Sequence, residues 1–173
     1  GSALIIRSSL PFTPIPISGL PDHFQAVAAN VLGVTYVSVY IAPPSHHSSM
    51  ISLRSIINNI STPCIILGDL NAHHTVWGSS NCYSLGHAVI ELIEDIPLCL
   101  LNDSSPTRLT PPSQNTSSVD ISLSSPSLAS SLSWTVLNDS HGSDHFPIII
   151  ELSSRTSRPQ PALEKISSRI FRT

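Results

Sequence analysis

The chain has 173 residues, of which 40% are hydrophobic and 11% are charged, and serine is abundant, with 33 residues. A charged share well below the roughly 25% of typical globular proteins predicts a surface rich in hydroxyl groups. Residues 1–152 hold three basic and ten acidic side chains, a net charge of −7, which disfavours tight non-specific binding to nucleic acid.

The lengths of the apolar runs and the spacing of the cysteines indicate the kind of cellular compartment in which the protein is expected. The apolar runs are shorter than the roughly 18 residues of a membrane span, so no membrane partner is expected. The cysteines Cys64, Cys82 and Cys99 are odd in number and have no CxxC spacing. Neither a disulfide framework nor a zinc ribbon is therefore expected, and a reducing, intracellular setting is the default.

Two strand–helix units come first in the predicted fold. Residues 34–41 are β-branched and aromatic and predict a buried strand, and residues 50–60 carry apolar side chains at helical spacing. Residues 64–67 form a short apolar run that predicts an interior strand. A polar loop over 69–84 and a second helix over 86–95 are expected to follow.

Short strands are predicted in the rest of the domain, at residues 98–101, 107–109, 119–123, 132–137 and 146–152. Strands with two helices between them indicate sheets with helical covers, a layered α/β or α+β class. We expect one domain over residues 1–152. The Ser/Arg/Pro-rich residues 153–173 predict a linker.

The first motif is Gly68-Asp69-Leu70-Asn71, at the end of the buried strand. A carboxylate and an amide two residues apart at a strand's end can point into one crevice. Asp69 could bind Mg²⁺ or position an attacking water, and Asn71 could hydrogen-bond a phosphoryl oxygen. A plain turn is the alternative, because Gly, Asp and Asn are common turn residues.

The second motif is Ser143-Asp144-His145, before the last apolar strand. A histidine at a strand mouth can donate to a phosphate, with a nearby carboxylate fixing its tautomer, and a polar turn is the alternative. Two histidine pairs, His46-His47 and His73-His74, are expected to be solvated loop residues, because adjacent side chains in extended chain point apart.

Six motifs taken in order resemble the endonuclease/exonuclease/phosphatase superfamily. They lie at residues 38–44, 65–74, 77–78, 106–107, 118–121 and 143–145. The chain is most similar to the apurinic-endonuclease-like domain of non-LTR (LINE-type) retrotransposon reverse transcriptase polyproteins. The resemblance runs from Gly1 to about Leu152. It implies two packed β-sheets flanked by helices, a four-layer sandwich that here lacks its first strands.

The resemblance also implies roles for five catalytic residues. Asp69 would orient the nucleophilic water and Asn71 would stabilise the phosphoryl transition state. Tyr40 would contact the scissile phosphate. His145 would donate to that phosphate, oriented by Asp120. The implied chemistry is metal-assisted phosphodiester hydrolysis, a DNA-nicking endonuclease activity.

The resemblance also implies which residues would contact the DNA and which would bind the metal ion. Thr107 and Ser143 would lie beside the DNA backbone, and Asp144 together with Asp69 would lie at Mg²⁺ or Mn²⁺. The implied partners are DNA and a reverse transcriptase domain in a parent polyprotein, and the implied location is the nucleus.

The sequence also departs from the family pattern. The family's first strands carry an Asn and the Glu that is the principal metal ligand, and both are expected upstream of Gly1. The chain is therefore expected to be truncated at both ends. A catalytically dead retroelement remnant is one alternative. A phosphatase of inositol phosphates or other small phosphoesters is another, although such enzymes carry Asp-Arg where Asp120-Ile121 stands here.

Overall fold

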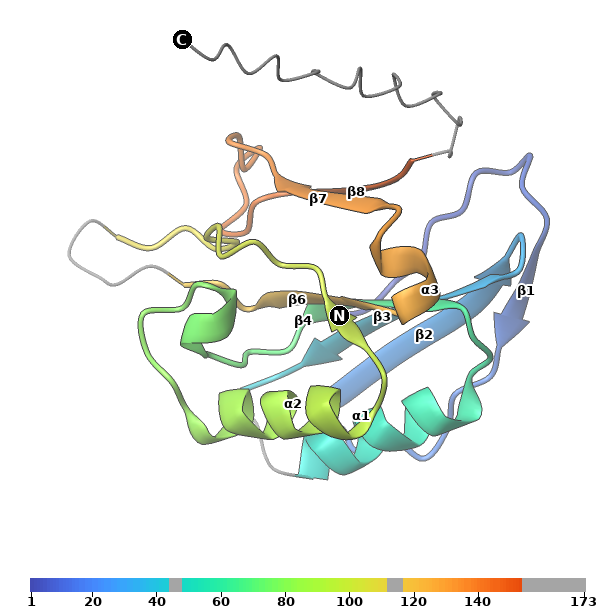
Figure 1. Cartoon of the computed structure of the whole chain (residues 1–173), viewed down its shortest axis with the longest axis horizontal. Coiled ribbons are helices and arrows are strands. Elements are labelled where there is room, and N and C mark those ends of the chain that lie inside the picture. Colours follow the sequence, from blue (N-terminus) through green and yellow to red (C-terminus); the bar gives the residue numbers. More distant parts are fainter. Residues whose placement is uncertain (44–47, 112–116, 154–173) are drawn as a thin grey trace, which may run out of the picture.

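The computed structural model describes residues 1–43, 48–111 and 117–153. Its strands form a six-stranded sheet in the order β1-β2-β3-β4-β6-β5 and a two-stranded sheet, β7-β8. Helices α1 and α2 cover one face of the larger sheet, and the β7-β8 pair lies over the opposite face (Figure 1). The predicted α/β class with two packed sheets is confirmed.

The elements have the following bounds. The larger sheet contains β1 (Phe12–Ile15), β2 (Phe24–Val31), β3 (Val34–Ile41), β4 (Cys64–Asp69), β5 (Cys99–Leu100) and β6 (Asp120–Ser124). The smaller sheet contains β7 (Leu132–Val136) and β8 (Ile148–Leu152). The helices are α1 (Ser48–Asn59), the 3₁₀ helix η1 (Thr75–Trp77), α2 (Ser84–Asp95) and α3 (Pro126–Ala129).

The strand–helix–strand order predicted for the first half is confirmed by β3, α1 and β4. Side chains alternate along β3, so that Val37, Val39 and Ile41 face the helices and join the core with Leu53 of α1. Strands β3 and β4 are parallel, as a helical crossover requires. Their carboxyl ends therefore lie together at one edge of the sheet.

Two strands that precede residue 34, β1 and β2, were not predicted from the sequence. Strand β2 pairs with β3 over its whole length, and the turn between them contains Leu32 and Gly33, both with positive φ. A two-residue turn of this kind matches the twist of a hairpin. The segment was missed because β2 is rich in alanine, which has weak strand propensity.

The predicted strand at 107–109 is wrong. Among the described residues this segment forms only isolated bridges, from Arg108 to Ser117 and to His145. The last strand begins at Ile148, two residues later than predicted, because Pro147 has no N–H to donate to a ladder. The predicted linker, apart from Ser153, lies outside the described residues, and no described helix is long and apolar enough to cross a membrane.

Candidate active site

Three of the expected site residues form a row across neighbouring strands. Tyr40 of β3 pairs in register with Asp69 of β4, and Asp69 pairs with Asp120 of β6. By strand alternation these positions share the sheet face that carries Tyr36 and Ser122, which is the face turned toward β7-β8. The row lies where β3 and β4 end and where β6 begins.

Asp69 and Asn71 are joined by hydrogen bonds that shape the strand end. The backbone N–H of Asn71 donates to Asp69 Oδ1 at 2.9 Å, and Asn71 Nδ2 donates to Asp69 Oδ2 at 3.2 Å. Asn71 Nδ2 also donates to the carbonyl of Ile41 at 2.7 Å, which ties the loop to the end of β3. Asn71 has a φ of 47°, a left-handed conformation that asparagine tolerates. Asp69 and Asn71 therefore form a turn, and the same turn holds the two candidate site residues together.

The surroundings of Asp69 disfavour its negative charge. Burial raises the pKa of the Asp69 carboxyl above its ordinary value, and the neighbouring charge of Asp120 raises that pKa further. The bond from Asn71, His145 and Arg108 act in the opposite direction, but burial dominates. A cation that enters the site would therefore stabilise the ionised form of the Asp69 carboxylate.

Asp120 and His145 form the second pair. His145 Nδ1 lies 2.9 Å from Asp120 Oδ2, and both side chains are largely buried, with exposed fractions of 29% for His145 and 18% for Asp120. Backbone bonds set the position of His145: Phe146 N–H donates to the Thr107 carbonyl, and Leu109 N–H donates to the Asp144 carbonyl. The pair joins residues 25 positions apart.

Thr107 lies beside this pair but is fully buried, with an exposed fraction of 0%. Its hydroxyl oxygen accepts hydrogen bonds from the backbone N–H groups of Val119, at 3.1 Å, and Asp120, at 3.2 Å. The expectation that Thr107 lies beside the DNA backbone stays a prediction. In the structure the Thr107 hydroxyl is occupied by backbone donors and positions the start of β6.

Ser143 and Asp144 lie at the exposed rim. Ser143 Oγ accepts a hydrogen bond from His145 N–H at 3.0 Å, so it supports the histidine from the outside. Asp144 Oδ2 lies 3.2 Å from a guanidinium nitrogen of Arg108. The carboxylate expected at a metal is thus paired with a cation. Arg108 was not singled out from the sequence; its bridge to His145 and its ion pair with Asp144 bring it to the site.

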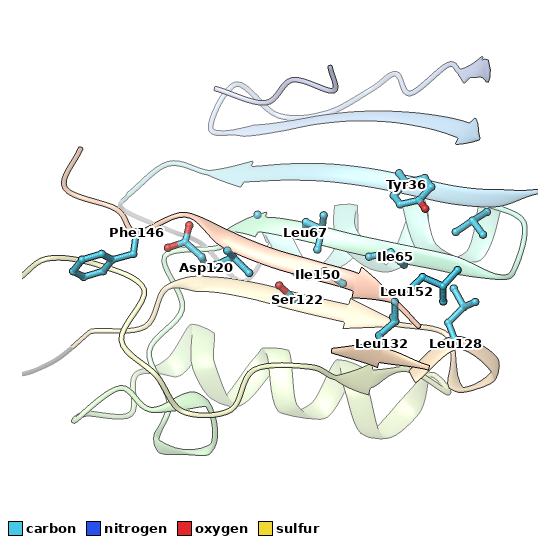
Figure 2. A pocket seen from close by; sticks show the side chains of 13 residues that line it. Tyr36, Ile65, Leu67, Asp120, Ser122, Leu128, Leu132, Phe146, Ile150 and Leu152 are labelled. Carbon is cyan, nitrogen blue, oxygen red and sulfur yellow. The ribbon is translucent and has the colours of Figure 1, made fainter. Parts of the chain in front are cut away.

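A cavity of about 450 Å³ lies between the two sheets. Its lining is mostly aliphatic, with Leu128, Leu132 and Leu152 at one end and Asp120 and Phe146 at the other (Figure 2). The Asp120–His145 pair therefore lies at one mouth of an apolar space.

Ring contacts join the histidines of the loop from Asn71 to α2 to neighbouring aromatic side chains. The His74 ring packs on Trp77 and on His87, and the His73 ring packs on Tyr83. Burial lowers the pKa of His73 and His74 below the ordinary value. His73 and His74 lie in the loop as expected and are half-buried by these ring contacts, and His46-His47 lie outside the described residues.

Two solved structures are similar to this chain in fold. The endonuclease domain of TRAS1, a telomere-specific non-LTR retrotransposon, matches with a TM-score of 0.70 and 22% identity, over 84% of this chain and 68% of that one. A 3′-5′ exonuclease (NExo) from Neisseria meningitidis matches with a TM-score of 0.60 and 18% identity, over 75% of this chain and 65% of that one.

A curated relative and a family model agree with the fold. The probable RNA-directed DNA polymerase from transposon X-element of Drosophila melanogaster is 26% identical over 98% of this chain, which spans only 19% of that protein. Residues 34–149 match the model of the endonuclease-reverse transcriptase family. The chain therefore belongs to the endonuclease-reverse transcriptase family, as a retrotransposon-type endonuclease domain of the endonuclease/exonuclease/phosphatase superfamily.

Proposed function

We propose that the site around Asp69 hydrolyses phosphodiester bonds of DNA with the help of a divalent metal ion, and so nicks a DNA strand. The observation that carries the proposal is the row of Tyr40, Asp69 and Asp120, with His145 bonded to one end and Asn71 bonded to its centre. The row brings an oriented carboxylate, a carboxylate-bound imidazole and an amide together at one edge of the sheet.

Each side chain of the row has a proposed part. Asp69 orients the attacking water, since its own orientation is fixed by two N–H groups of Asn71. The Nδ1–H of His145 donates a hydrogen bond to Asp120 Oδ2, and in the imidazolium form the Nε2–H donates a second hydrogen bond to a phosphate oxygen. The hydroxyl of Tyr40 contacts the same phosphate. Asn71 Nδ2 exchanges its longer hydrogen bond, to Asp69 Oδ2, for one to a phosphoryl oxygen as negative charge develops there.

The carboxylates present fit a magnesium or manganese ion. Mg²⁺ in proteins is commonly held by one or two carboxylates, with water and substrate oxygens completing the shell. Asp69 and Asp120 are opposite each other on adjacent strands, and burial, with a smaller contribution from Asp120, raises the pKa of the Asp69 carboxyl. Asp69 would hold the ion, and Asp144 could join it only by leaving Arg108. The ion would offset charge on the phosphoryl oxygens.

The proposed partners follow from the relatives. The similar proteins are a retrotransposon endonuclease domain and a transposon RNA-directed DNA polymerase, of which this chain spans about a fifth. DNA is therefore the proposed substrate, a reverse transcriptase domain in the parent polyprotein is the proposed partner, and the nucleus is the proposed location.

The test is nicking of supercoiled plasmid. A version extended upstream to include the expected Asn- and Glu-bearing strands should nick in Mg²⁺ but not in EDTA, and an Asp69→Ala, His145→Ala double variant of it should be inactive. A control carrying Asp95→Ala and His141→Ala, at exposed positions outside the row, should nick normally. An extended version that is folded but inert would refute the proposed function.

A catalytically dead remnant is the second candidate. Two pairings favour this candidate: Asp120 pairs with His145, and Asp144 pairs with Arg108. Asp69 is then the carboxylate of the described site that has no basic partner. We therefore expect the 173-residue chain itself to nick no faster than its own double variant. Clear nicking by this chain would remove the remnant as a candidate.

A further inference from the structure

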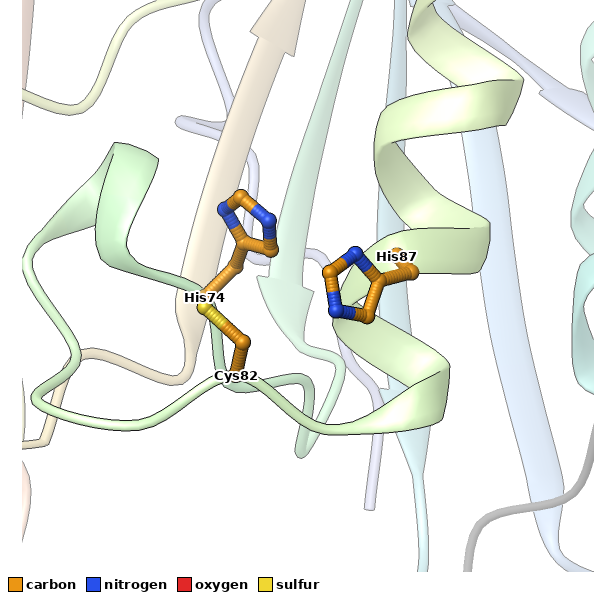
Figure 3. A group of neighbouring side chains, drawn as sticks. All are labelled: His74, Cys82 and His87. Atoms are coloured by element: carbon orange, nitrogen blue, oxygen red, sulfur yellow. The ribbon is translucent and has the colours of Figure 1, made fainter.

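A cluster of nitrogen and sulfur donors lies apart from the carboxylate row. One ring nitrogen each of His74 and His87 and the sulfur of Cys82 lie within 4.8 Å of one another. Figure 3 shows the three side chains converging from the loop after β4, the segment before α2 and the helix α2 itself. Within residues 1–43, 48–111 and 117–153, this is the group of His, Cys, Asp and Glu side chains close enough to share a metal ion.

The backbone brings these donors together without a metal. Tyr83 N–H donates to the His73 carbonyl at 3.0 Å, and His87 N–H donates to the Tyr83 carbonyl at 3.1 Å. Helix α2 approaches the loop so closely at Gly86 that an added Cβ would lie 2.0 Å from the His73 carbonyl oxygen. The loop and the helix are therefore locked together on either side of the cluster.

The spacing is close to that of a coordinated ion. Donor atoms around tetrahedral zinc, at bond lengths of about 2.0–2.3 Å, lie roughly 3.3–3.8 Å apart. The observed spread of 4.8 Å would close with side-chain movements of about 1 Å. His87 and Cys82 are exposed, so that both can make such a movement and an ion can reach them.

The donor types select the ion. Two imidazoles and a thiolate suit zinc and its spectroscopic substitute cobalt, whereas Mg²⁺ prefers oxygen ligands. This chemistry differs from that of the carboxylate row. We propose that His74, Cys82 and His87 bind one Zn²⁺ ion, with water in the fourth position, and that the ion fastens the loop beginning at Asn71 to helix α2.

Two hydrogen bonds already engage the proposed ligands. One joins Cys82 Sγ and Thr75 Oγ1, which lie 3.6 Å apart, and the other involves His74. His74 Nδ1 accepts a hydrogen bond from the backbone N–H of Val76 at 3.2 Å, which places the proton of the neutral ring on Nε2. Coordination through Nε2 moves that proton to Nδ1, and coordination through Nδ1 displaces the Val76 N–H. Either way this bond breaks, so the tautomer or ligation state of His74 reports on zinc.

The experiment is a titration of the purified chain with Co²⁺ alone, followed by displacement with Zn²⁺, without DNA or Mg²⁺. One equivalent should bind and give sulfur-to-cobalt charge-transfer absorption. Cys82→Ser should abolish that absorption, and His87→Ala should weaken binding by about tenfold or more. Cys99→Ser and His141→Ala, which change the same residue types outside the cluster, should bind as the parent chain does.

Two further readouts separate zinc binding from general stability. Zn²⁺ should raise the Tm of the parent chain and of Cys99→Ser, but not that of His87→Ala, whose exposed side chain can be removed without disturbing the core. Nitrogen NMR should show the His74 ring change on zinc addition. The proposal is overturned if the parent chain binds no cobalt, if bound cobalt shows no sulfur absorption, or if Cys82→Ser and His87→Ala bind as tightly as their controls.

Discussion

Replacing Gly68 with alanine tests how closely the backbone packs where Asp69 is held. Gly68 has a φ of 154° and pairs in register with Val39 of β3. A Cβ built at Gly68 would lie 1.8 Å from the Val39 carbonyl oxygen and 2.7 Å from its carbonyl carbon. Because these are main-chain atoms of an adjacent strand in the middle of the sheet, β3 and β4 would have to separate locally.

The cost of Gly68→Ala has two parts. An alanine at positive φ costs about 1–2 kcal/mol by itself. Separating the strands removes the pairing around Val39 and leaves buried polar groups unsatisfied, at about 1–3 kcal/mol for each group, so we expect a total of roughly 4–6 kcal/mol. Gly33→Ala is the matched control, because Gly33 has a φ of 85° and nothing within 4 Å of an added Cβ.

Urea unfolding followed by circular dichroism measures both variants. Gly33→Ala should lose about 1–2 kcal/mol and Gly68→Ala at least about 2 kcal/mol more, or it should fail to fold at all. Equal losses for the two variants would refute the reasoning, because both would then carry only the cost of a positive φ, with no added cost from the close approach of Val39 at Gly68.

Three further changes probe the charges and hydrogen bonds around the site. Since the pKa of Asp69 is raised, the native state of the parent chain should lose stability as pH rises above 3.8 in EDTA, and Asp69→Asn should gain stability relative to it; a difference independent of pH would contradict this. Arg108→Gln should raise the pKa of the Asp69 carboxyl in a carbon NMR titration, whereas Arg54→Gln, on α1, should not change it. Ser79→Ala removes a hydroxyl that donates to the Ser118 carbonyl at 2.9 Å and accepts from its N–H, so urea unfolding should show a loss of about 2–3 kcal/mol rather than less than 0.5 kcal/mol.

Local patterns were sufficient where one short segment determines the structure. The β-branched residues of 34–41 predicted β3 to the residue, because alternate side chains of that strand are buried and branched side chains pack well there. Asp69 and Asn71 were also found locally, since they are two residues apart and bond directly to each other. In contrast, β2 is specified mainly by its pairing with β3, which its alanine-rich sequence does not reveal.

Contacts between distant segments were beyond local patterns. The Asp120–His145 pair came from the family resemblance, because nothing near either residue indicates a partner 25 positions away. Arg108 reaches the site through irregular bridges and an ion pair that no periodicity predicts. Similarly, His74 and His87 converge because Gly86 permits a close approach of helix and loop, whereas in the sequence Gly86 is only a helix-weakening residue.

The backbone segments that carry the Asp120–His145 pair are both hydrogen-bonded to Thr107. Thr107 bonds through its hydroxyl to the N–H of Asp120 and through its carbonyl to the N–H of Phe146, so it holds both chain segments that carry the pair. A double-mutant cycle with Asp120→Ala and His145→Ala should give a coupling free energy of about 1–2 kcal/mol, typical of a partly buried charged hydrogen bond.

Thr107→Val keeps the shape of the side chain but removes the hydroxyl oxygen that holds the start of β6. The coupling free energy measured in this background should fall toward zero, because the carboxylate and the imidazole are then no longer kept at 2.9 Å. Thr135→Val, at an exposed position on β7, is the control and should leave the coupling unchanged. If the coupling survives in Thr107→Val, the pair is positioned by its own bond and not by Thr107.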